Sequence, residues 1–188
     1  MPLLALFTGA RLEELGQLRV DDVREENGCW YFNITDLGEN QQVKTATSRR
    51  RVPVHSQLIR AGLLLYWQDL RGRGEARLFP DLNSGIKGKV TASWSKWWGR
   101  YLRNVIGITD KRLVFHSFRH TFKDACRDAA IDEAIHDALT GHAGGGVGRK
   151  YGGRYPLVPL NQAMEKLDYK GLSVPVVMAD ETANRGKS

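Results

Sequence analysis

The sequence predicts a mainly α protein with one small antiparallel β-sheet, an α+β fold. Several stretches repeat apolar residues at the three- and four-residue intervals of a helix, whereas two shorter stretches are rich in aromatic and β-branched residues. The 188 residues, 41% hydrophobic and 26% charged, have the composition of an ordinary globular protein. This length is enough for one good core, so a single domain is expected.

The N-terminal part is expected to be helical. Apolar residues over 3–7 predict the end of a buried helix that is interrupted at Thr8-Gly9, and a second helical pattern runs through Leu12, Leu15 and Leu18. The chain opens abruptly on this apolar run, with no preceding cap or turn. We therefore expect it to be a fragment whose N-terminal part lies elsewhere.

A small sheet is expected next. Residues 29–34 (Cys-Trp-Tyr-Phe-Asn-Ile) and 50–54 (Arg-Arg-Val-Pro-Val) have the composition of strands. Between them, residues 36–40 predict a turn and residues 42–45 a short strand. The best prediction is therefore an antiparallel sheet of three strands.

The remaining chain is expected to form helices separated by loops. Asp132 is a plausible N-cap for one of them, because its carboxylate can accept hydrogen bonds from the first free amides. Helical periodicity places the expected helices over 55–70, over 91–106, from Val114 through 122, over 132–139 and over 160–167. Pro156 and Pro159 are expected to bracket a turn before the last of these. We expect the domain to span residues 1–172, followed by a mobile polar tail over 173–188.

Composition also limits the location and the partners of the protein. No apolar run approaches the length of a membrane span, and the start has no basic leader of a signal peptide, so a cytoplasmic protein is expected. Cys29 and Cys126 lie far apart with no second pair to complete a metal site, and are expected to be free, partly buried thiols. The 28 Lys and Arg outnumber the 21 Asp and Glu, and the net charge of +7 favours a polyanionic partner.

Two segments of the second half carry groups suited to chemistry. In residues 115–122 (Phe-His-Ser-Phe-Arg-His-Thr-Phe), a helix would align the phenylalanines in one apolar stripe, while His116 and Arg119 project together from a neighbouring edge. Farther on, Thr140-Gly141-His142 is followed by a glycine-rich run and then Tyr151. A proton-transfer group, a fixed cation, a second imidazole and a phenol are thus arranged along one stretch.

The order and spacing of these residues resemble the catalytic domain of the tyrosine recombinases, also called phage integrases. Four separated motifs carry the resemblance over about residues 3–172: Thr8-Gly9-Ala10-Arg11-x-x-Glu14-Leu15, His116-x-x-Arg119, Gly141-His142, and a tyrosine nine residues after that histidine. The resemblance implies the recombinase catalytic-domain fold and an enzyme that cuts and rejoins DNA through a 3′-phosphotyrosine, with no cofactor, metal or ATP. Family members usually carry a separate DNA-binding domain upstream, which we expect to lie outside this chain.

The resemblance assigns the cationic residues to the scissile phosphate. Arg11 and Arg119 match the two arginines that bind the charged oxygens, a task that suits the planar guanidinium. Lys44 looks like the lysine that protonates the departing 5′ oxygen, if neighbouring cations lower its pKa. Two alternatives stay open: Arg11 forms only a surface salt bridge with Glu13 or Glu14, and Lys44 only contacts phosphates.

The same resemblance assigns the imidazoles and the phenol. Tyr151 is the expected nucleophile, His116 accepts its proton or orients the phosphate, and His142 donates a hydrogen bond to a non-bridging oxygen. Tyr155 competes for the nucleophile's role, but the spacing from His142 favours Tyr151.

The histidines without a motif are expected to be structural or exposed. One helical turn after His116, His120 is expected to be partly buried and bonded to the backbone. We expect His55 and His136 to be surface residues.

A DNA-facing surface is expected from the basic residues. Trp94, Trp97 and Trp98 have helical spacing, which favours core packing over the alternative of base stacking. The expected phosphate contacts are Arg49, Arg50, Arg51, Lys87, Lys89, Lys96 and Arg100.

The resemblance implies double-stranded DNA as the partner and a tetramer on DNA, with a monomer possible without it. It also implies a role in DNA integration or recombination by a mobile genetic element. Two other classes of protein stay open: a basic DNA-binding module that cuts nothing, and a phosphoryl-transfer enzyme acting on small substrates through His116 or His142.

Overall fold

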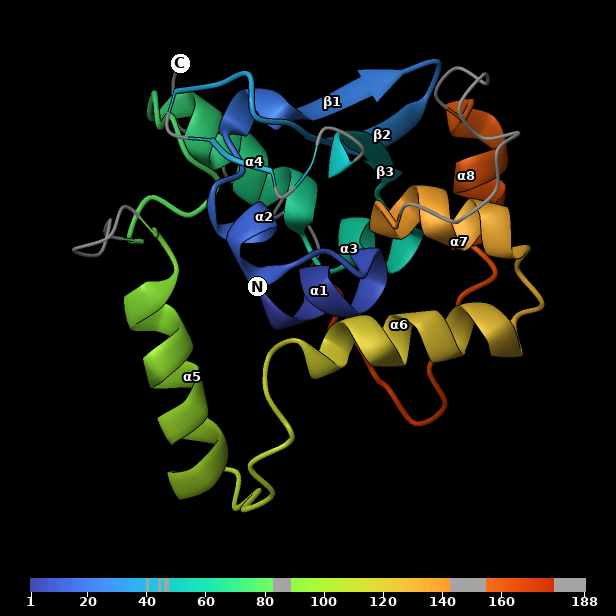
Figure 1. Cartoon of the computed structure of the whole chain (residues 1–188). Coiled ribbons are helices and arrows are strands. Elements are labelled where there is room, and N and C mark those ends of the chain that lie inside the picture. The colour runs from blue at the N-terminus through green and yellow to red at the C-terminus, as the bar shows by residue number, and fades with distance from the viewer. Residues whose placement is uncertain (40, 44, 46–47, 83–88, 143–154, 178–188) are drawn as a thin grey trace.

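The computed structural model describes residues 1–39, 41–43, 45, 48–82, 89–142 and 155–177. The fold is mainly helical with a three-stranded antiparallel sheet, which confirms the predicted fold class (Figure 1). In chain order the elements are α1 (Pro2–Thr8), α2 (Leu12–Gly16), the 3₁₀ turn η1 (Val20–Asp22), β1 (Val23–Glu26), β2 (Cys29–Ile34), β3 (Arg50–Pro53), α3 (Ser56–Arg60), α4 (Leu63–Gly72), α5 (Ala92–Asn104), α6 (Ser117–Asp128), α7 (Glu133–Thr140) and α8 (Leu157–Met164).

The sheet has β2 at its centre, between β1 and β3. Val23, Phe32 and Val52 lie opposite one another across the three strands and are all buried, so this row faces the core. The strands predicted over 29–34 and 50–54 are confirmed. The strand predicted over 42–45 is wrong, because the described residues there lie outside the sheet and the third strand is β1.

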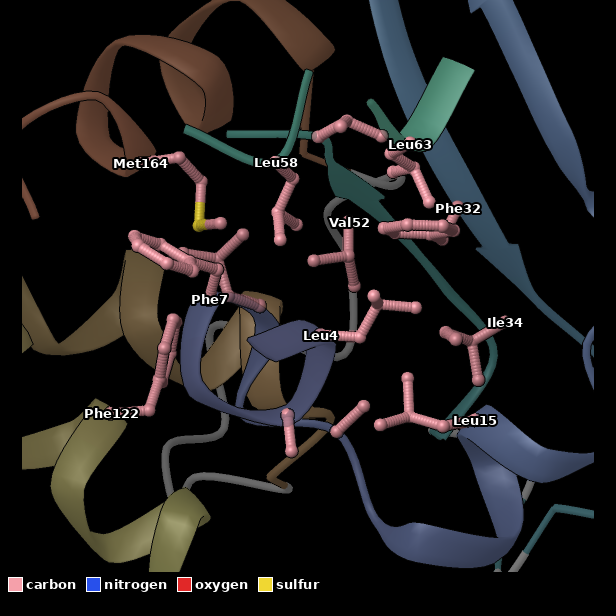
Figure 2. Packing of buried hydrophobic residues seen from close by; sticks show 14 of the residues in the cluster. Leu4, Phe7, Leu15, Phe32, Ile34, Val52, Leu58, Leu63, Phe122 and Met164 are labelled. Atoms are coloured by element: carbon pink, nitrogen blue, oxygen red, sulfur yellow. The ribbon is translucent and has the colours of Figure 1, made fainter. Parts of the chain in front are cut away.

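The core is built around α1. Figure 2 shows Leu4 and Phe7 of this helix between Val52 of the sheet and Phe122 of α6. Phe7 and Phe122 are only 2% and 0% exposed. A helix packed on more than one side needs apolar residues around most of its circumference, which explains the nearly continuous apolar run at the start of the chain.

The predicted helix over 55–70 is wrong in one respect, because it is broken into α3 and α4. Gly62 stands at the break with a left-handed φ of 87°, which glycine adopts without the strain of a side chain. Its missing side chain also makes room for Val177, whose backbone amide donates to the carbonyl of Arg60 at 2.9 Å. Val177 of the predicted tail thus lies against this break, and 178–188 fall outside the described residues.

The later helices agree well with their predicted ranges. α5 begins and ends close to 91–106, and Asp132 caps α7 as predicted, since its side chain accepts from the amide of Ala134. There are two exceptions: α6 begins at Ser117 instead of Val114, so Phe115 and His116 precede the helix, and α8 spans Leu157–Met164 instead of 160–167. Pro159 lies in its first turn, where a missing N–H costs no intrahelical bond, so the prolines do not bracket a turn.

The histidines without a motif are placed differently from the prediction. His55 is buried. Its Nδ1 caps α3 by accepting from the amide of Gln57 at 3.0 Å, and the centroid of its ring lies 4.6 Å from that of Phe7. His136 is buried on the inner face of α7. His120 is exposed instead of partly buried. Burial lowers the pKa of both His55 and His136.

Both cysteines are free and buried, close to the prediction of partly buried thiols. Burial raises the pKa of the Cys126 thiol to about 12. Within the described part of the chain, no helix is long and apolar enough to cross a membrane.

Replacing Gly9 by alanine tests the contact between the end of α1 and α6. Gly9 has a φ of 60°, and a Cβ there would lie 2.5 Å from Cδ1 of Phe122. We expect Gly9→Ala to lower the free energy of unfolding by about 1–3 kcal/mol, measured by urea denaturation. The matched control is Gly99→Ala within α5, where a Cβ meets nothing within 4 Å. That change should be neutral or stabilising by up to about 1 kcal/mol, and equal effects of the two variants would contradict the contact.

Candidate active site

The turn between α1 and α2 presents a backbone carbonyl to α6. The hydroxyl of Thr8 donates to the carbonyl of Leu4 at 2.5 Å and accepts from the amide of Ala10 at 3.2 Å, which fixes the turn. Gly9 then adopts its left-handed conformation. The carbonyl of Gly9 accepts from Nη1 of Arg119 at 2.7 Å across 110 positions of sequence.

Arg119 joins this turn to the end of α7. Its Nη2 donates to the carbonyl of Thr140 at 2.6 Å, and the residue is 5% exposed. Burial lowers the pKa of Arg119 to about 10, and the nearby charges of Arg11 and Arg50 contribute. The guanidinium therefore remains charged at neutral pH. Arg11, two residues after Gly9, is near enough for its charge to act on Arg119.

Arg11 is the N-cap residue of α2 and is bound by Glu14. The Nη1 of Arg11 donates to Oε1 of Glu14, and its backbone amide donates to Oε2, both at 2.8 Å. The predicted alternative of a salt bridge is thus present. The side chain of Arg11 is nevertheless 28% exposed, so its guanidinium is within reach of a ligand.

Glu14, which the sequence indicates only as a residue of the Arg11 motif and an alternative salt-bridge partner of Arg11, supports the site. It is 4% exposed, and its two oxygens also accept from Nη1 and Nη2 of Arg50 at 3.1 and 2.8 Å. Burial alone raises the pKa of Glu14, but the charge of Arg50 and the hydrogen bonds from Arg50 and Arg11 outweigh it and hold the pKa at about 2. The carboxylate is therefore ionised near neutral pH and fixes two arginines.

Arg50 is buried with Nε, Nη1 and Nη2 all bonded within the protein, which contradicts its predicted contact with DNA. At 5% exposed, it donates from Nε to the carbonyl of Leu139 at 2.7 Å and from Nη1 to that of Ser48 at 2.8 Å. Arg50 and Arg119 thus bind two consecutive carbonyls at the C-terminal end of α7, where positive charge is favourable. Gly141 ends this helix, and His142 follows it with its backbone amide bonded to the carbonyl of Asp137.

His116 is the N-cap residue of α6, and its ring centroid lies 5.3 Å from that of His120. Partial burial lowers the pKa of His116, and the charges of His120, Arg119 and Arg11 lower it further. A neutral imidazole that can accept a proton is therefore favoured near neutral pH. His142 is exposed at the end of α7 that Arg119 and Arg50 hold.

Three predicted site residues lie outside the described residues: Lys44, Lys87 and Tyr151. The competing Tyr155 is described; its side chain is 40% exposed, and its carbonyl accepts from Nη2 of Arg51 at 3.4 Å. In the described part of the chain, no group of three or more His, Cys, Asp or Glu is arranged to hold a metal ion.

The basic residues fall into two sets. Arg49 pairs with Asp36, and Arg51 pairs with Glu26 at 3.1 Å and lies over the ring of Tyr31. Lys89, Lys96 and Arg100 are exposed. The second set, on and just before α5, thus offers cations with more solvent access.

The tryptophans of α5 differ in position: two pack against the core and one is largely exposed. Trp94 and Trp98 pack edge-on against Phe115, with ring centroids 5.2 and 6.4 Å from it. This contact agrees with the prediction of core packing. Trp97 is 46% exposed and stacks on Tyr101 at 5.2 Å.

The comparison with family models decides the family. The model described as the phage integrase family matches residues 1–152. The chain belongs to the phage integrase family. No curated protein matches it.

Comparison with solved structures gives a likeness of fold to a site-specific recombinase. The pre-cleavage complex of the XerH site-specific recombinase with its difH substrate has a TM-score of 0.50 and 22% sequence identity, over 76% of this chain and 38% of that chain. The post-cleavage complex with a palindromic difH substrate has a TM-score of 0.49 at the same identity and coverage. The chain thus spans well under half of the length of these relatives, and the likeness at this identity concerns the fold.

Removing the charge of Glu14 tests the polar network of this integrase domain. Glu14→Gln leaves the buried Arg50 without its counter-charge, so we expect the free energy of unfolding to fall by about 3–5 kcal/mol in urea denaturation. The double variant Glu14→Gln, Arg50→Met removes the stranded charge as well and should be less destabilised than Glu14→Gln alone. If the double variant lost as much free energy of unfolding as Glu14→Gln and Arg50→Met lose together as single variants, the ion pair would be contradicted.

The same network predicts a pH dependence of stability. The pKa of Glu14 is about 2 in the folded chain, against 4.5 for an ordinary glutamate. Its ionised form therefore stabilises the fold fully above pH 4.5, and this contribution is lost as the pH falls toward 2. The stability difference between the wild type and Glu14→Gln should shrink across this interval.

Proposed function

We propose that this chain is the catalytic domain of a site-specific DNA recombinase that cuts and rejoins strands through a 3′-phosphotyrosine. One observation carries the proposal: Arg119 bonds the turn that precedes Arg11 and the end of α7 that precedes His142. Motifs separated by more than 100 positions are thereby brought to one electropositive site, as a single scissile phosphate requires.

The arginines of this site suit a phosphate in its transition state. Arg119 is as buried as Arg50, but only two of its five N–H groups bond carbonyls of the described residues, so the remaining donors are the ones proposed to bind a phosphate oxygen. Arg11 is partly exposed, and its charge acts on Arg119. Fixed cations of this kind stabilise charge that develops on the non-bridging oxygens; Glu14 holds Arg11 in place, and the carbonyls of Gly9 and Thr140 hold Arg119.

The reaction proposed is an exchange of phosphodiester bonds. Tyr151 attacks phosphorus as its proton passes to His116, the 3′-phosphotyrosine bond forms, and the bond to the 5′ oxygen breaks as Lys44 supplies a proton. A 5′ hydroxyl of another strand then reverses the step, so the energy of the original bond is retained. His142 donates to a non-bridging oxygen. The roles of Tyr151 and Lys44 rest on their motif positions alone.

The partner proposed is double-stranded DNA, bound by four copies of the protein during recombination. The exposed cations Lys89, Lys96 and Arg100 would contact phosphates. Integration of a mobile genetic element is the biological role that agrees with the family.

A trapping assay tests the chemistry. The full-length protein is incubated with a nicked duplex of its own attachment sequence, so that the released strand end diffuses away and the covalent complex accumulates. We expect a covalent band in denaturing electrophoresis that Tyr151→Phe abolishes and the control Tyr155→Phe preserves. Arg11→Ala should slow its formation by about 10²–10³-fold, as loss of one charge-stabilising donor does.

Other outcomes separate the alternatives. DNA binding without any covalent band from the wild type would indicate a binding module. A band that persists in Tyr151→Phe and disappears in Tyr155→Phe would move the nucleophile. Release of phosphate from small esters would favour the third class of protein.

Salt dependence tests the proposed contact between α5 and DNA. Each phosphate contact releases condensed counterions, so Lys96→Ala and Arg100→Ala should each reduce the slope of log affinity against log salt by about one. The matched control is Arg127→Ala, near the end of α6 opposite His116, which should leave the slope unchanged. Affinities measured by fluorescence anisotropy over a salt series give the slopes, and equal slopes for all variants would remove α5 from the interface.

A further inference from the structure

Helix α5 stands away from the rest of the molecule, and one of its attachments is Glu13 (Figure 1). Oε1 of Glu13 accepts from the backbone amide of Val90 at 2.9 Å, and Oε2 accepts from the hydroxyl of Thr91. These residues are 77 and 78 positions from Glu13. In α2, by contrast, Glu13 is only two residues from Arg11.

This contact supplies what the start of α5 lacks. The first turn of α5 contains no acidic residue, and the side chain of its N-cap Thr91 makes no capping bond within the helix. A carboxylate beside the free amides of a helix N-terminus is stabilising. Gly16 adds a second contact, because a Cβ there would lie 2.1 Å from Cγ2 of Thr91. The short helix α2 therefore touches the start of α5 at two places.

A second attachment of α5 leads to the same site. Trp94 and Trp98 pack against Phe115, and Trp98 also packs 6.0 Å from the ring of Phe118. These two phenylalanines immediately precede His116 and Arg119. Helix α5 is thus joined to the segment that carries Arg11 and to the segment that carries His116 and Arg119.

We propose that Glu13 is a positioning residue that couples the docking of α5 on DNA to the placement of Arg11. Glu13 and Glu14 are neighbours in a helix of five residues; one binds the start of α5 and the other binds Arg11 and Arg50. A displacement of α5 is therefore passed through α2 to the guanidinium of Arg11. This inference rests on the proposed function, since it concerns the phosphate that Arg11 would hold.

Single-turnover cleavage of the nicked duplex tests the coupling. The maximal rate at saturating protein and the half-saturating concentration are measured for Glu13→Ala, Thr91→Ala and Thr91→Ser in the full-length protein. A small misplacement of a catalytic group costs up to about 10²-fold, so the two alanine variants should lose about 10- to 100-fold in maximal rate. Their half-saturating concentration should stay unchanged, because Lys96 and Arg100 are intact. Thr91→Ser keeps the hydroxyl and should cleave at the maximal rate of the wild type. The matched control is Glu39→Ala, which changes an exposed glutamate.

Three results would overturn the proposal. The first is a higher half-saturating concentration with an unchanged maximal rate, which would make Glu13 a residue that affects binding only. The second is an unchanged maximal rate in Glu13→Ala. The third is a rate loss that disappears when each variant is assayed well below its own melting temperature, which would reduce Glu13 to a stabilising residue.

Hydrogen exchange without DNA keeps the test independent of the proposed reaction. Thr91→Ala changes only the α5 side of the contact, so coupling predicts faster exchange of the α2 amides, whereas unchanged exchange would contradict it. If the wild type forms no covalent complex, the proposed function fails and the exchange result alone decides whether α5 and α2 are coupled. If the wild type cleaves DNA and Glu13→Ala cleaves it equally fast, the proposed function stands and this inference fails.

Discussion

The arrangement of this domain depends on the buried ion pair between Glu14 and Arg50. Removing both charges from water is costly, and the cost is offset only when every polar atom finds a well-placed partner. Here the carboxylate accepts from Arg11 and Arg50, and Arg50 also reaches the carbonyls of Ser48 and Leu139. Because these partners come from α2, from β3 and the segment before it, and from α7, the pair is satisfied in one arrangement of the three elements.

The apolar core brings the partners of this network within reach. Phe7 of α1 and Phe122 of α6 are almost completely buried, and Gly9 lets the two helices approach closely at the end of α1 (Figure 2). This approach delivers the carbonyl of Gly9 to Arg119. Packing thus sets the distance between α1 and α6, and the arginines then fix the orientation of the loops that carry the site.

Much of the fold could be predicted from the sequence, because α5 and α7 have clear helical periodicity and β2 is rich in aromatic residues. β1 was missed since its exposed residues Arg24, Glu25 and Glu26 give no alternating pattern, and the break at Gly62 depends on a distant contact with Val177. The motif residues of the site were found through a family resemblance. The supporting role of Arg50 was not, because three consecutive arginines look alike in sequence and only the fold buries this one at 5% exposure.

Because Cys126 is buried, the reactivity of its thiol reports whether the core around α6 is open. A thiolate is the reactive form of cysteine, and a pKa of about 12 leaves almost none of it at neutral pH while α6 is packed on the core. Cys29 is buried as well, and burial raises the pKa of its thiol too. Reaction with a soluble alkylating reagent therefore requires the core to open, so the rate of labelling at Cys126 follows the opening of the helix that carries His116 at its start.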